Sequence, residues 1–196
     1  MNPATHNRTD SLDSWGRHFQ ELTARSTEFA RYRDMFEPKL EHLYKIEYSN
    51  EFLLLLDEMG PKWKEELVFH CTGNCECLAQ GPLETGRQSE KPEPSKVACN
   101  LWCKRPQCPI QGILKHGFLL KHCGLHQYNW RSCRKAHFVT SHVGESRWAG
   151  IRKCGTRQYL AHFICKVRNM EMVDVNTYAV YADTDILPVY LALVPV

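Results

Sequence analysis

The sequence lacks several features that would assign it to a common class. It has no apolar run of about 18 residues, the length that a membrane-spanning helix needs. Its start, MNPATHNRTDSLDSW, has no apolar signal-peptide core, so we expect a reducing compartment. The formal net charge of the 196-residue chain is only +3, which excludes a strong overall attraction to nucleic acid or membranes. With 43% hydrophobic residues, the chain can nevertheless bury a core.

Cysteine is absent before Cys71 and after Cys165, although the chain contains ten cysteines and ten histidines. In a secreted protein these cysteines would form disulfides, whereas in a reducing compartment they favour metal ligation or redox chemistry. The C-x2-C pair of thioredoxin-like enzymes is missing, and so are the H-x-E and P-C-x2-C motifs of zinc deaminases. No cysteine stands in a recognisable nucleophile motif. We therefore expect zinc binding and no enzymatic activity.

Close spacings of cysteine and histidine point to zinc, which prefers four tetrahedral nitrogen or sulfur ligands. C-x3-C-x-C begins at Cys71, C-x3-C-x4-C begins at Cys99, and H-C-x2-H begins at His122. The first cluster would share an ion with ligands from the second, and the third would complete this site or build another. Alternatively, several of these cysteines are small buried hydrophobic residues. The candidate ligands are Cys71, Cys75, Cys77, Cys99, Cys103, Cys108, His122, Cys123 and His126.

Basic and aromatic residues follow, as on surfaces that bind nucleic acid. A solvated basic face is the alternative interpretation, because the net charge is small. The histidines at 137 and 142 are interpreted as surface or core residues rather than ligands. The candidate nucleic-acid contacts are Lys104, Arg105, Trp130, Arg131, Arg134 and Lys135.

The first third of the chain has an apolar pattern that is compatible with helices. Aromatic and leucine residues between Trp15 and Phe36 recur at spacings of three to seven, and a second apolar segment runs from Leu40 to Leu56. We interpret residues 1–60 as an N-terminal helical region that supports the rest of the chain or binds a partner. Gly60 and Pro61 end the pattern.

Residues 61–196 are interpreted as a Cys/His-rich zinc-binding domain of the α+β class, with an exposed loop at 80–96. Near the end, QYLAHFICKVRN, TYAVYADT and LPVYLALVPV have the composition of strands, and the polar DTD between the last two indicates a hairpin. The predicted fold is thus α+β: N-terminal helices, then a Cys/His-rich zinc-stabilised domain with short C-terminal β-strands.

Four segments resemble, in their order, the 34-kilodalton protein family of adenovirus early region 4. They read FLLLLDEMGPKWKEELVFHCTGNCECL, CNLWCKRPQCPIQGIL, HQYNWRSCRKAHFV and CGTRQYLAHFICKV. The resemblance covers roughly residues 47–168. A diverged member of this family would be a viral early protein.

The resemblance implies an adaptor in the host nucleus and cytoplasm. Such adaptors work with a second viral protein and recruit a host cullin–elongin ubiquitin ligase, which degrades host target proteins. Elongin docking in this family uses a helix with a leucine and, four positions later, a small or cysteine residue. Leu67 and Cys71 have that spacing and would share one helical face. The alternative is that Leu67 enters the core and Cys71 binds zinc. A zinc-dependent regulator that binds nucleic acid is the second hypothesis, and a cysteine-dependent hydrolase is the third.

Overall fold

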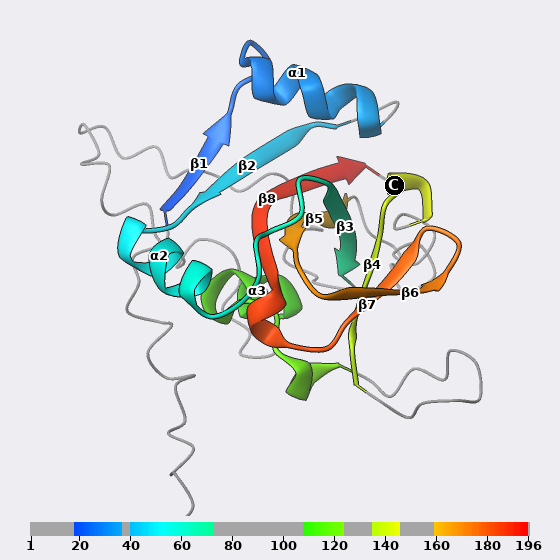
Figure 1. Ribbon diagram of the computed structural model, residues 1–196. Helices are drawn as coiled ribbons and strands as arrows, with labels where there is room; N and C mark the ends of the chain where they lie inside the picture. Colours follow the sequence, from blue (N-terminus) through cyan, green and yellow to red (C-terminus); the bar gives the residue numbers. More distant parts are fainter. Residues whose placement is uncertain (1–17, 37–39, 73–107, 124–134, 146–158, 196) are drawn as a thin grey trace, which may run out of the picture.

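The computed structural model describes residues 18–36, 40–72, 108–123, 135–145 and 159–195 (Figure 1). Strands dominate these residues, and the helices are short. The strands are β1 (His18–Leu22), β2 (His42–Glu47), β3 (Leu67–Thr72), β4 (His137–Thr140), β5 (Tyr159–Val167), β6 (Met170–Asp174), β7 (Thr177–Val180) and β8 (Ile186–Pro195). The helices and helical turns are α1 (Thr27–Arg33), η2 (Asp34–Phe36), α2 (Asn50–Glu58), α3 (Pro109–His116), η5 (Leu120–His122) and η6 (Asp183–Asp185).

All eight strands belong to one antiparallel sheet with the order β1-β2-β8-β5-β3-β4-β7-β6. The long strands β5 and β8 lie near its centre, and a register shift between Ile164 and Cys165 marks an irregularity in their ladder. β2 pairs with β8, although some 140 residues of chain lie between them. The first and last parts of the chain therefore form one sheet.

This sheet shows that the predicted fold class is wrong. The N-terminal region is not a set of helices, because it contributes β1 and β2 to the sheet, and a zinc-stabilised domain does not follow it as a separate structure. The three C-terminal runs do form strands, but η6 joins β7 to β8 across the sheet rather than as a hairpin. The misleading signal was the spacing of Phe19 and Leu22. A spacing of three indicates one helical face, yet it places the two side chains on opposite faces of β1.

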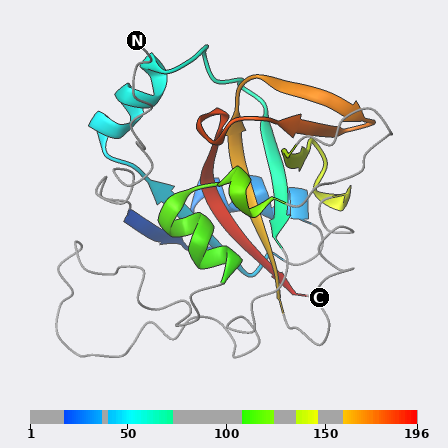
Figure 2. The same ribbon diagram turned by 90° about the horizontal axis from the view of Figure 1, so that it is seen from below.

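The sheet carries an apolar core on each face. α3 lies on one face of the sheet (Figure 2). Its Ile110 and Leu114 pack there with Phe163 and Leu191. On the other face, Phe29 of α1 belongs to a second core with residues of β1, β2, β3, β5 and β8. Alternate residues of β5 and β8 point to the two cores, as the pleat of a strand requires. We call these faces the α3 face and the α1 face.

Side-chain caps fix where the helices begin. The Ser26 and Ser49 hydroxyls accept hydrogen bonds from the N–H groups of Phe29 and Phe52, three residues into α1 and α2. Each bond satisfies a backbone donor that has no partner within its helix. α1 and α2 are therefore local insertions between strands, begun by serines that the sequence displays.

Arg168 is the centre of a buried polar cluster, with 1% of its surface exposed. Its Nε donates to Asp185 Oδ1 at 3.0 Å, and its Nη2 donates to the Thr184 carbonyl at 3.0 Å. Its Nη1 donates to the carbonyl oxygens of Leu56 at 2.7 Å and Pro61 at 3.3 Å. Through these contacts, Arg168 connects the end of β5 and η6 to the end of α2.

Candidate functional site

The structure describes some of the candidate zinc ligands and separates them. Cys71 lies in β3 and packs with Leu160 on the α1 face, whereas Cys108 belongs to the core of the α3 face. The sheet lies between these two thiols. Among the described residues, no group of three or more His, Cys, Asp or Glu side chains is arranged to hold a metal ion. Cys75, Cys77, Cys99, Cys103 and His126 lie outside the described residues.

Cys108 has a structural role in the fold. It is the N-cap of α3, and its Sγ accepts a hydrogen bond from the Gln111 N–H at 3.4 Å. The side chain is buried, with 5% of the residue exposed. Burial and capping account for this cysteine without a metal.

The segment with Leu67 and Cys71 is not a helix. Both residues lie in β3, which pairs with β5 on one side and with β4 on the other. Cys71 is 9% exposed, and Leu67 packs against the core of the α1 face. A central strand cannot offer the helical leucine motif that the spacing predicted. The run of strand-forming residues LVFHCT was the local signal for this outcome.

The nucleic-acid prediction falls mostly on undescribed residues. Lys135 is exposed just before β4. Lys104, Arg105, Trp130, Arg131 and Arg134 lie outside the described residues.

Cys123 of the third cysteine cluster belongs to a row of three polar side chains that contact one another. Cys123 follows η5, His137 begins β4, and Asp183 begins η6. The Cys123 Sγ lies 3.1 Å from His137 Nδ1, and His137 Nε2 lies 2.9 Å from Asp183 Oδ1. The same Asp183 oxygen accepts the Leu120 N–H at 2.6 Å, which fixes the carboxylate. We call these three residues the thiol–imidazole–carboxylate array.

Burial holds the imidazole of this array in one orientation. His137 is 2% exposed, and the Phe118 ring packs edge-on against it at 5.5 Å between centroids. An ionised carboxylate only accepts hydrogen bonds, so the His137 proton that faces Asp183 is on Nε2. In the neutral imidazole, the lone pair of Nδ1 then faces the Cys123 thiol.

The thiol of the array keeps its proton. Burial, together with the negative charge of Asp183, raises the pKa of Cys123 to about 11, and Lys135 offsets part of this shift. Cys123 is only half-buried, unlike Cys165, which is fully buried in the core. The array therefore presents a protonated thiol, reachable from solvent, next to an imidazole that can accept its proton.

Sequence reasoning interpreted His137 as a surface or core histidine and did not single out Asp183. Cys123 is 14 positions from His137, and His137 is 46 positions from Asp183. No local motif has such spacings. The H-C pair at His122 and Cys123 was the available signal, and it identified one of the three members.

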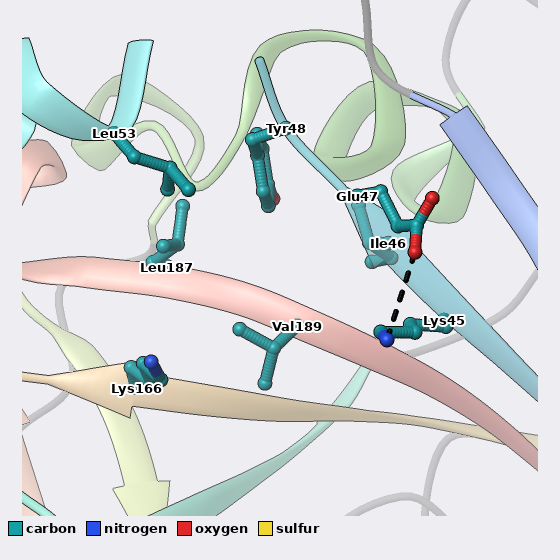
Figure 3. A pocket seen from close by; sticks show the side chains of 8 residues that line it. All are labelled: Lys45, Ile46, Glu47, Tyr48, Leu53, Lys166, Leu187 and Val189. Carbon is teal, nitrogen blue, oxygen red and sulfur yellow. Dashed lines mark ion pairs between the residues drawn. The ribbon is translucent and has the colours of Figure 1, made fainter. Parts of the chain in front are cut away.

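A second candidate site is a groove of about 340 Å³ between α2 and the sheet (Figure 3). Leu53 of α2 points toward Leu187 of β8, with Val189 beside it. Lys45 contributes to the rim and pairs with Glu47 at 3.6 Å. Lys166 is exposed on the other side, and no carboxylate among the described residues forms an ion pair with it. The groove thus combines an apolar wall with the ammonium group of Lys166, which has no ion-pair partner among the described residues.

The outer surface of α2 carries apolar side chains among acidic ones. Leu54 is 64% exposed, Leu55 is 37% exposed and Met59 is 49% exposed, whereas Phe52 and Leu56 are buried beneath the helix. Glu51, Asp57 and Glu58 are exposed on the same helix. Exposed leucines are costly, because their apolar surface stays in water instead of the core. We call α2 together with the groove beside it the α2 surface.

Comparison with known proteins found no family model and no curated protein that matches this chain. Within the described residues, no helix is both long and apolar enough to cross a membrane.

Proposed function

We propose that this protein is an adaptor that docks other proteins through the α2 surface. The resemblance to the adenovirus early region 4 family supports a specific partner, a host cullin–elongin ubiquitin ligase. In this proposal a second viral protein assists, and host target proteins in the nucleus and cytoplasm are degraded. The observation that carries the proposal is the row of exposed apolar side chains on α2.

The geometry of α2 suits a helix-in-groove interface. Such interfaces place the apolar side chains of one helix in the hydrophobic groove of a partner. Leu54 and Leu55 would enter the partner, with Met59 one turn after Leu55. Because Leu67 and Cys71 lie in a central strand, α2 replaces them as the proposed docking helix.

The groove beside α2 adds a preference for a partner with an acidic residue. Leu53, Leu187 and Val189 supply apolar contacts, and Lys166 supplies an unpaired positive charge at the rim. An apolar segment of the partner that carries a carboxylate would satisfy both features. Opposite charges at an interface rim mainly raise the association rate and the specificity.

The test is co-purification of elongin and cullin with the tagged full-length chain. Leu54→Asp combined with Leu55→Asp should abolish co-purification, because two charges would enter an apolar interface. Met172→Asp is the matched control, since Met172 is 68% exposed on the far strand β6 and should tolerate the same charge. Retention of the ligase by the double variant, or its equal loss from the control, would contradict the proposal.

Zinc remains a prediction. Native mass spectrometry with and without a chelator counts the metal directly. The alternative function, a zinc-dependent regulator that binds nucleic acid, also remains a prediction, and Lys135 is the candidate contact residue that the structure describes.

A further inference from the structure

The four described cysteines differ in what surrounds them. Cys108 caps α3, Cys71 packs with Leu160, and Cys165 is fully buried in the core. Packing or capping explains these three thiols. Cys123 has a histidine nitrogen at 3.1 Å, and it is the least buried of the four.

We propose that Cys123 is an acyl-acceptor site, at which His137 serves as base and Asp183 as the residue that positions the imidazole. A nucleophile within hydrogen-bond reach of a base, with the base oriented by a third group, is the arrangement that activates thiols. The two distances of 3.1 Å and 2.9 Å meet this criterion on both sides of the imidazole. The site is independent of the proposed docking function.

The reaction is the transfer of an acyl group from an activated ester or thioester. His137 Nδ1 takes the Sγ proton as Sγ attacks the carbonyl carbon and forms a new carbon–sulfur bond. The bond to the leaving oxygen or sulfur breaks, and the leaving group receives the proton from His137. The products are an S-acylated Cys123 and a free alcohol or thiol, so no oxidant or metal is needed.

The proposed substrates are activated acyl compounds, in which the bond to the leaving oxygen or sulfur breaks readily. The described residues place no group of donors at the array to stabilise the oxyanion of an amide, and amide cleavage is not part of the proposal.

The experiment treats the full-length protein with p-nitrophenyl acetate. The expected result is one equivalent of p-nitrophenolate, and one acetyl group that peptide mapping locates on Cys123. Cys123→Ala should remove this acetylation. His137→Gln should slow it by about 100-fold, the lower end of the range for a general base. His142→Gln is the matched control, because His142 is exposed just after β4 and should react like the wild type.

The positioning role of Asp183 has its own readout. An asparagine at this position can donate to Nε2 and so favour the tautomer with the proton on Nδ1. Nitrogen-15 NMR of the His137 ring should show that exchange in Asp183→Asn, and acetylation should slow with it. A structural role alone would change neither the tautomer nor the rate in a variant that still folds.

Peptide mapping of the acetylated wild-type chain tests the proposal even if a variant fails to fold. Acetylation spread evenly over the cysteines, or absent from Cys123, would overturn the proposal. Acetylation of Cys123 only after a chelator removes a bound metal would also overturn it, since the thiol would then be a metal ligand.

Discussion

Two buried polar clusters in this protein differ in how completely they are closed. Every guanidinium nitrogen of Arg168 has an acceptor, and the Trp63 ring covers the cation at 4.5 Å. In the thiol–imidazole–carboxylate array, the buried His137 connects a half-buried thiol to Asp183, whose side chain is 33% exposed. The Arg168 cluster is closed on all sides, whereas the array is open at both ends.

This difference suggests that the Arg168 cluster mainly stabilises the fold, whereas the array can take part in a reaction. A buried charge with complete hydrogen bonding resists change, and its loss leaves several groups unpaired. A half-open array is less important for stability but leaves a reactive atom accessible. Because Arg168 also holds the Leu56 and Pro61 carbonyl groups, the closed cluster fixes the end of the proposed docking helix.

The strongest way to break the closed cluster is Arg168→Ala. This change removes the guanidinium donor from the Asp185 carboxylate and from three carbonyl groups, and it should cost roughly 3–5 kcal/mol in the free energy of unfolding. Denaturant titration measures the loss. Arg33→Ala is the control, because the Arg33–Asp34 pair is exposed and should contribute about 0–1 kcal/mol. Equal effects of the two changes would contradict the importance of the Arg168 cluster.

A smaller change perturbs the same cluster from its edge. A Cβ at Gly60 would lie 2.8 Å from Arg168 Cζ, so Gly60→Ala should destabilise the protein by roughly 1–3 kcal/mol through crowding. Gly112→Ala is the matched control within α3, where nothing lies within 4 Å of the new Cβ. Helix propensity predicts that the control stabilises by roughly 0.5–1 kcal/mol. Thermal unfolding should therefore show lower stability for Gly60→Ala and higher stability for Gly112→Ala. Changes in the same direction would contradict the crowding of Gly60 against Arg168.

The open array predicts a still smaller effect on stability. Asp183→Asn removes the charge from the hydrogen bonds to His137 and Leu120 and should cost about 1 kcal/mol. The same denaturant titration measures this cost. A loss as large as that of Arg168→Ala would mean that the array, too, is a structural cluster.

The smallest effect on stability is expected from a change at Tyr190, and it should show only at high pH. Burial, the nearby Tyr32 and the hydrogen bond to Glu28 raise the pKa of Tyr190 above its ordinary value of 10.0. The folded state therefore holds this proton more tightly, and its contribution is complete below pH 10 and is lost as the pH rises above 10. Tyr190→Phe should flatten the decline of stability above pH 10, measured by thermal unfolding. An unchanged dependence of stability on pH would contradict a raised pKa of Tyr190 in the folded state.

Local signals in the sequence predicted part of this structure. The three C-terminal runs form strands, as predicted. Ser26 and Ser49 mark helix starts that the sequence analysis did not single out, although capping rules recognise such serines. β1 and β2 were missed because their aromatic residues mimic a helical period. The pairing of β2 with β8 has no local signal either, because the two strands lie far apart in the sequence. The same limit applies to the array, whose members meet only when η5, β4 and η6 pack together.

The central claim is that the α2 surface is where a partner docks. A photo-reactive amino acid at position 54, in the full-length protein expressed in host cells, tests it most directly, with position 172 as the control. The account predicts that elongin cross-links from position 54 and not from position 172. Elongin cross-links of equal strength from both positions, or from neither while the ligase still co-purifies, would contradict it.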